Sequence, residues 1–275
     1  MKALIFSKED TASMNVLNKF KENYDLIKEG ECCNNTFYKL ERFHLFILNE
    51  KMVHSENIDE IIKNVSKTEY EDFIFVSKHR SEAGIKCLTV HPFGNYGEAD
   101  LGGKRREIVS VNPVLLTGSL LKLNELNTMK DFSINFEVTH HGPFISGRGF
   151  FIEIGSSENE YKNDEAGKIL MNAIMDMNET GDDIIAVGIG GGHYAPRFTS
   201  LALSRKISFG HMAPKYHAKD IDEEMLKKMI NRSNAKYIIM EKKDLNSAER
   251  KRLNDIISTL HGLELLDPDS LEPRY

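Results

Sequence analysis

Residues 163–192 read NDEAGKILMNAIMDMNETGDDIIAVGIGGG. Within residues 163–178 the apolar side chains recur at i, i+3, i+4, i+7, i+8 and i+11, which predicts an amphipathic helix. Gly181 follows at the place where a helix stop is expected. The apolar run 184–189 then predicts a buried strand that leads directly into Gly190–Gly192. A helix followed by a buried strand and a tight glycine turn is the repeating unit of an α/β fold.

The same alternation continues on both sides of this stretch. Strands are expected at 3–6, 43–48, 73–76, 87–90, 134–138, 150–154, 207–209 and 237–240, with helices around 16–20, 58–65, 220–230 and 246–260. This order predicts one domain over residues 1–275, a three-layer α/β/α fold with a mostly parallel or mixed central sheet. Residues 95–130 are glycine-rich, polar and poor in periodicity, so we expect an insertion there.

Composition narrows the class of protein. The 275 residues are 28% charged and 40% hydrophobic, which is typical of a soluble globular protein and excludes a disordered chain or a fibre. Three cysteines exclude a disulfide framework and favour a reducing, cytoplasmic location. No apolar run approaches the roughly 18 residues that span a bilayer, and no signal peptide is expected. The net charge of −6 argues against a general DNA-coating protein, but a local basic surface can still bind nucleic acid.

Five histidines lie in segments that follow expected strands: His91, His140, His141, His193 and His211. Ligands of open α/β sheets bind beyond the carboxyl ends of the strands, so parallel, adjacent strands would bring these imidazoles together. For a single residue such as His91 a hydrogen-bonded loop position is the more common role. The adjacent pair His140-His141, followed by a glycine and a proline, favours a fixed and exposed turn. His44, His54, His79, His217 and His261 are assigned to the surface or to structural hydrogen bonds.

A short motif occurs twice. Residues 192–198 and 210–216 both read Gly-His-x-Ala-Pro followed by a cation and an aromatic ring. One interpretation is two similar turns shaped by glycine and proline. The other is that each turn offers an imidazole for metal or protons, a cation for phosphate and a ring for a base. On that interpretation we predict a substrate-binding set of Arg197, Phe198, Lys215 and Tyr216, together with Lys104 and Arg105 of the basic cluster that follows a glycine pair.

The glycine run and one buried carboxylate complete the candidate site. Gly191 and Gly192 are expected to form a tight turn, and the same turn can present backbone N–H groups to a developing negative charge. The nearby carboxylates are Glu98, Asp100, Glu137 and Glu153. Glu153 lies inside the apolar strand 150–154, where it needs a partner or a metal ion. With His140 or His141 it can form a zinc site with an open position for water. The predicted catalytic residues are His140, His141, His193, Gly191 and Gly192, and the predicted metal ligands are His91, His141, Glu153, His193 and His211.

Three motifs carry a resemblance to a known family: residues 139–143 (THHGP), 190–198 (GGGHYAPRF) and 210–216 (GHMAPKY). They resemble the archaeal-type D-aminoacyl-tRNA deacylases, which plants also carry, and the resemblance covers essentially the whole chain. It implies hydrolysis of the ester between a D-amino acid and the 3′ end of tRNA. It also implies zinc dependence, a cytoplasmic monomer, and a fold similar to the phosphorylase and peptidyl-tRNA hydrolase class.

The residues themselves fit hydrolysis by water. The chain has no G-x-S-x-G nucleophile motif and no plausible cysteine nucleophile, so direct attack by water is expected rather than an acyl-enzyme. A zinc ion lowers the pKa of a bound water to about 7. Two alternatives remain open: a zinc-dependent hydrolase of small acylated or peptide substrates, and a non-catalytic tRNA-binding module.

Overall fold

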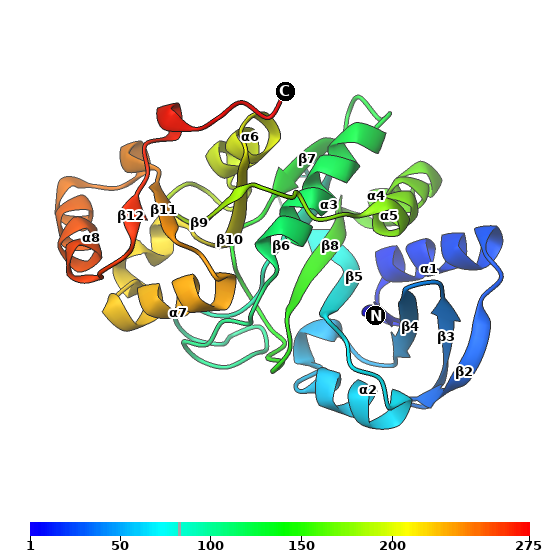
Figure 1. The fold of residues 1–275 in the computed structure, drawn as a ribbon. Helices are drawn as coiled ribbons and strands as arrows, with labels where there is room; N and C mark the ends of the chain where they lie inside the picture. The colour runs from blue at the N-terminus through cyan, green and yellow to red at the C-terminus, as the bar shows by residue number, and fades with distance from the viewer. Residues whose placement is uncertain (82–83) are drawn as a thin grey trace.

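The computed structural model describes residues 1–81 and 84–275 and contains two β-sheets (Figure 1). The larger sheet has the order β2-β3-β4-β1-β5-β8-β6-β7, and the smaller has the order β10-β9-β11-β12. The strands are β1 (Lys2–Ser7), β2 (Ile27–Cys32), β3 (Asn35–Leu40), β4 (Phe43–Leu48), β5 (Asp72–Arg80), β6 (Cys87–His91), β7 (Ser133–Phe136), β8 (Gly149–Ser156), β9 (Ile184–Ile189), β10 (Ile207–Ala213), β11 (Tyr237–Met240) and β12 (Glu264–Leu265).

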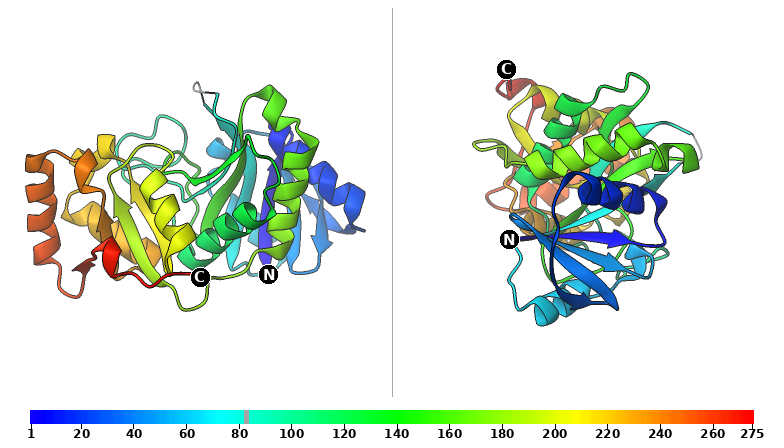
Figure 2. Two further views of the ribbon diagram at one scale, coloured as in Figure 1. Left: turned by 90° about the horizontal axis from the view of Figure 1, so that it is seen from above. Right: turned by 90° about the vertical axis from the view of Figure 1, so that its right-hand side faces the viewer.

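Helices flank both sheets, which lie side by side (Figure 2). The α-helices are α1 (Thr11–Asn23), α2 (Ile58–Ser66), α3 (Pro113–Leu126), α4 (Glu158–Tyr161), α5 (Asp164–Asp176), α6 (Pro196–Ser204), α7 (Glu223–Ser233) and α8 (Ser247–Thr259). The 3-10 helices are η1 (Met52–His54), η2 (Lys215–Asp220), η3 (Lys242–Asp244) and η4 (Pro268–Ser270). Helices α1, α3 and α5 pack together on one face of the larger sheet, and the apolar side of α2 packs on the other face. The predicted α/β class with a mixed central sheet flanked by helices is confirmed.

Strand β8 is buried on both faces, and its alternating side chains determine which face of the larger sheet receives Glu153. Phe150, Ile152 and Ile154 join the core under α1, α3 and α5, because alternate side chains of a strand point to opposite faces. Phe151 belongs to the core of the other face, and Glu153 therefore points to that face as well. A carboxylate is thus delivered into an apolar layer, where it requires partners.

Two sequence expectations need correction. The insertion expected at 95–130 ends earlier, because residues 113–126 form helix α3, which packs against α5 and β10. This helix is apolar nearly all round, as a helix buried on several sides is, and so shows no amphipathic stripe. Helix α7 begins at Glu223 rather than near residue 220, and it is capped by Asp222, which accepts a hydrogen bond from the Met225 N–H.

In the part of the chain that the structure describes, no helix is long and apolar enough to cross a membrane. Cys32, Cys33 and Cys87 are free thiols in the structure.

Candidate active site: a histidine–glutamate cluster

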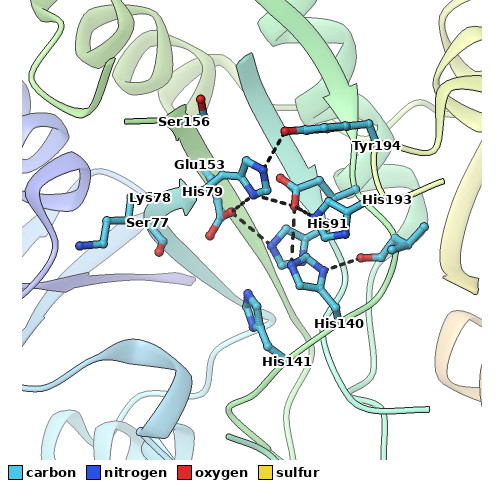
Figure 3. A network of polar contacts seen from close by, with 12 residues as sticks. Ser77, Lys78, His79, His91, His140, His141, Glu153, Ser156, His193 and Tyr194 are labelled. Atoms are coloured by element: carbon cyan, nitrogen blue, oxygen red, sulfur yellow. Dashed lines mark hydrogen bonds and ion pairs between the residues drawn. The ribbon is translucent and has the colours of Figure 1, made fainter. Parts of the chain in front are cut away.

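Seven side chains from both halves of the molecule form one cluster, called here the histidine–glutamate cluster (Figure 3). Its members are His79, His91, Glu137, His140, His141, Glu153 and His193. His79, His91 and Glu153 lie on strands of the larger sheet, Glu137, His140 and His141 lie in the segment that follows its strand β7, and His193 lies on the turn after β9.

The register of the larger sheet brings His79, His91 and Glu153 together. β5 runs parallel to β8 and places His79 opposite Gly155, whereas β6 runs antiparallel and places His91 opposite Phe151. Residues 151, 153 and 155 point to the same face, so His79, Glu153 and His91 share that face. The imidazoles therefore meet on a face of the sheet, and not at a common carboxyl edge of parallel strands as expected, because β6 is antiparallel to β8.

Glu137 lies at the centre of the cluster. Its Oε2 is 2.9 Å from His79 Nδ1, 2.9 Å from His193 Nε2 and 3.6 Å from His140 Nε2. The side chain is fully buried, and its backbone N–H donates to the Val90 carbonyl, which extends the β6–β7 ladder by one residue. Burial alone would raise the pKa of Glu137, but hydrogen bonds from His193 and His79 hold it well below the ordinary value. Glu137 is therefore a carboxylate at neutral pH.

Glu153 is the second buried acid of the cluster. Its Oε2 lies 3.5 Å from His91 Nε2 and 3.9 Å from His79 Nδ1. The His91 ring stacks on Phe151 with centroids 5.2 Å apart and on His140 with centroids 4.3 Å apart. The apolar face of β8 thus holds the ring plane of His91 and directs its Nε2 towards the carboxylates.

Backbone carbonyls fix the orientation of three imidazoles. His91 Nδ1 is 3.0 Å from the Pro92 oxygen, His140 Nδ1 is 2.7 Å from the Val138 oxygen, and His141 Nδ1 is 2.6 Å from the Gly142 oxygen. A carbonyl only accepts, so each Nδ1 carries the proton and donates it. In the neutral rings the lone pair is then on Nε2, the tautomer found in histidines that ligate metal ions.

The charges of the cluster divide its histidines into two groups. Burial and the nearby His91 lower the pKa of His140 well below its ordinary value, and the same causes lower the pKa of His141 to about 4. Burial also acts to lower the pKa of His79 and of His91, but Glu137 and Glu153 outweigh it and raise both. His140 and His141 are therefore neutral at pH 7 and available as ligands.

The donor set fits a bound metal ion. Among the described residues, His91 Nε2 and Glu137 Oε1 are buried without a hydrogen-bond partner. Three groups have ligand atoms within 4.8 Å of one another: His91 with His140 and His141, His79 with Glu137 and His193, and His91 with Glu137 and Glu153. Imidazole and carboxylate ligands are those of catalytic zinc sites. The side chains of His140 and His193 are 25% and 34% exposed, so a substrate can reach the cluster.

Comparisons with known proteins agree on one family. The model of the D-aminoacyl-tRNA deacylase family matches residues 66–265. The chain belongs to this family. The D-aminoacyl-tRNA deacylase of Archaeoglobus fulgidus is 36% identical over 270 residues, which cover 97% of this chain and 96% of that protein. The enzyme of the same name from Pyrococcus abyssi is 37% identical over 274 residues, 97% and 99% of the two chains. A crystal structure described as a conserved protein of unknown function superimposes with a TM-score of 0.91 at 34% identity, covering 99% and 98%.

In this deacylase-family chain, four of the five predicted metal ligands (His91, His141, Glu153 and His193) lie in the cluster, and His211 does not. His211 lies within β10 rather than after it, and both ring nitrogens are engaged, with Thr139 Oγ1 at 3.0 Å and the Val109 oxygen at 2.9 Å. Burial lowers the pKa of His211 to about 3. It is a neutral structural histidine that supports the turn before His140.

The predicted substrate-binding residues lie in different surroundings. Phe198 is fully buried beside Phe209, so the structure corrects the expectation that its ring stacks on a base. The Tyr216 ring is 51% exposed and remains a stacking candidate, next to the exposed Lys215. Arg197 is 3.9 Å from Glu241, Lys104 lies over the Phe144 ring at 4.0 Å, and the exposed Arg105 pairs with Glu98 at 2.6 Å.

Gly191 and Gly192 lie on the turn that carries His193, and a Cβ atom on either would meet no atom within 4 Å. A ligand therefore has room to approach this backbone.

The sequence did not indicate three residues that lie at the site: His79, Glu137 and Tyr194, whose hydroxyl is 3.1 Å from His79 Nε2. The alternation of Phe73, Phe75, Ser77 and His79 indicates that His79 shares the buried face of its strand. The flanking Lys78 and Arg80 instead favoured a basic surface segment.

Proposed function

We propose that this protein hydrolyses the ester bond of D-aminoacyl-tRNA and releases the free D-amino acid and tRNA. The observation that carries the proposal is the buried Glu137 carboxylate, which contacts three imidazoles in a cluster open to substrate. Family membership gives the substrate class, because the relatives bear the name D-aminoacyl-tRNA deacylase.

We propose zinc as the cofactor, held by the Nε2 atoms of His91, His140 and His141. These three side chains offer ligand atoms within 4.8 Å of one another, and the two of lowest pKa are neutral at pH 7. Zinc in such a site supplies Lewis acidity and lowers the pKa of a bound water to about 7.

The pair of Glu137 and His193 then handles protons. Because His193 Nε2 donates to Glu137 at 2.9 Å, the neutral ring presents its Nδ1 as a base. His193 Nδ1 takes a proton from the attacking water as its oxygen bonds to the ester carbon. The backbone N–H groups of Gly191 and Gly192 stabilise the oxyanion. When the bond to the ribose oxygen breaks, His193 returns the proton to that oxygen.

The test is a deacylation assay on D- and L-aminoacyl-tRNA, with and without a chelator, together with elemental analysis. We expect release of the D-amino acid only, loss of activity on chelation, and recovery with zinc. Equal turnover of small D-amino acid esters would favour the small-substrate hydrolase. Salt-sensitive tRNA binding without any deacylation would favour the non-catalytic binding module.

We also propose that the protein acts as a cytoplasmic monomer whose partner is the 3′ end of tRNA. All seven residues of the cluster belong to a single chain. Sedimentation at the assay concentration checks this, and a dimer whose dissociation abolishes activity would contradict it.

A further inference from the structure

The smaller sheet contains a second candidate site. β9 pairs in parallel with β10 on one side and with β11 on the other (Figure 1). The chain therefore adds β10 on one side of β9 and then crosses to the opposite side to add β11. In open α/β sheets ligands bind outside the carboxyl ends of the strands at such a switch point. Here these ends carry Gly190–Gly192, which follow β9, and Glu241, which follows β11.

A cavity of about 260 Å³ lies at this switch point. Its lining includes Gly191, Pro196, Arg197, Ser200, Glu241 and Lys243. Among the described residues, none that lines it belongs to the histidine–glutamate cluster, yet His193 lies on the same turn as Gly191. This volume lies just below the roughly 300–1,000 Å³ of small-molecule pockets, which suits a ligand no larger than one nucleotide.

Glu241 is an incompletely satisfied acid in this cavity. Its side chain is 10% exposed, and its Oε2 has no hydrogen-bond partner among the described residues. The nearest cations are Arg197, with Nε 3.9 Å from Oε2, and Lys243, with Nζ 3.9 Å from Oε1. A buried carboxylate oxygen without a donor is costly, so a ligand that brings a hydroxyl donor is favoured here.

The other side of the cavity suits an anion. Helix α6 begins there, and its N-cap residue, Ala195, makes no side-chain hydrogen bond to the first turn. Pro196 at the first position has no N–H, so the backbone N–H groups of the residues that follow it in the first turn are the ones that can bind phosphate, and Arg197 adds a positive charge beside them. Gly191 leaves open space above the backbone at the same place.

We propose that this cavity binds one 5′-phosphorylated ribonucleotide of the single-stranded 3′ end of tRNA. Glu241 accepts a hydrogen bond from the ribose 2′-hydroxyl, while Arg197 and the α6 N-terminus hold the phosphate. This inference rests on the proposed function, since the turn that carries His193 separates the nucleotide from the ester. A carboxylate bound to the 2′-hydroxyl also distinguishes RNA from DNA.

The test is calorimetric titration of the complete protein with AMP and CMP and with their 2′-deoxy counterparts. A hydrogen bond to a charged group corresponds to a ribonucleotide preference of roughly tenfold or more. We expect Glu241→Gln to remove this preference and Arg197→Ala to weaken the binding of ribo- and deoxyribonucleotides alike. The matched control is Glu264→Gln, which removes the same charge from an exposed position on the neighbouring β12. It should change neither the affinity for nucleotides nor the preference for ribonucleotides.

Deacylation kinetics separate this inference from the proposed function. Glu241→Gln should raise the KM for D-aminoacyl-tRNA, with its melting temperature checked against wild type. Equal affinity of the wild type for ribo- and deoxyribonucleotides, or an undiminished preference in Glu241→Gln, would overturn the inference even if deacylation proceeds. Nucleotide binding that depends on Glu241 in a protein without deacylase activity would uphold the cavity and reject the proposed function.

Discussion

Replacement of Glu137 by Gln tests the centre of the site with almost no change in shape. Oε2 accepts from two imidazoles at 2.9 Å and has a third nitrogen at 3.6 Å. A hydrogen bond to a charged group contributes about 1.5–3 kcal/mol, and the neutral amide retains part of it. We therefore expect a loss of about 3 kcal/mol for the two short contacts, which is a decrease in kcat/KM of roughly a hundredfold or more.

The assay is deacylation of D-aminoacyl-tRNA at saturating zinc, with the zinc content of each preparation measured in parallel. Glu153→Gln is the matched comparison, since its carboxylate has only the longer contacts of 3.5 and 3.9 Å. We expect a smaller loss of kcat/KM for Glu153→Gln, because the electrostatic interaction between the carboxylate and an imidazole weakens as their distance grows. A Glu137→Gln enzyme within threefold of wild type, or a ranking in which Glu153 matters more, would refute this account of the centre.

Three further changes are expected to have defined results. His211→Asn should flatten the dependence of stability on pH. The folded pKa of His211 is about 3 and the unfolded pKa is about 6.5, so protons bind the unfolded state and stability falls as pH drops between these values. The wild-type loss at pH 5 is about 2 kcal/mol from this group, measured by denaturant unfolding at pH 7 and pH 5. Gly210→Ala places a Cβ 2.1 Å from Ser233 Oγ and should destabilise the fold by about 1–3 kcal/mol, seen as a lower melting temperature. His141→Ala should lower zinc content and deacylation together while the circular dichroism spectrum is retained, and normal turnover would remove His141 from the ligand set.

Local patterns were sufficient for most of the elements and for the residue types of the site. Apolar runs marked β1, β4, β5, β6, β8, β9 and β11, since strands buried on both faces are nearly continuous in hydrophobicity. Glu153 was identified because a carboxylate inside such a run must have a partner. The buried strands and the role of Glu153 can both be predicted because they depend only on residues that are adjacent along the chain.

Pairing direction is the property that the sequence did not contain. With β6 parallel to β8, His91 would lie at the edge of the sheet, whereas the antiparallel pair places it opposite Phe151 and beside Glu153. His79 joins the cluster through the parallel pair of β5 with β8, which places it opposite Gly155. The prediction that His211 is a metal ligand fails for a related reason. β10 continues to Ala213, so this histidine lies inside the strand and both of its ring nitrogens are hydrogen-bonded, to Thr139 and to Val109.

The position of His193 depends on how the two sheets are joined. Two backbone hydrogen bonds cross between them at the site, from Val138 N–H to the His193 carbonyl and from Thr139 N–H to the Met212 carbonyl, both 2.9 Å long. The larger sheet and the segment after β7 thus supply the two carboxylates and the proposed metal ligands, while the smaller sheet supplies His193, the proposed proton acceptor. Because catalytic groups must be held within a fraction of an ångström, a small shift between the sheets removes the contact of His193 with Glu137 without unfolding either sheet. Loss of activity should therefore precede loss of structure when the junction between the sheets is weakened.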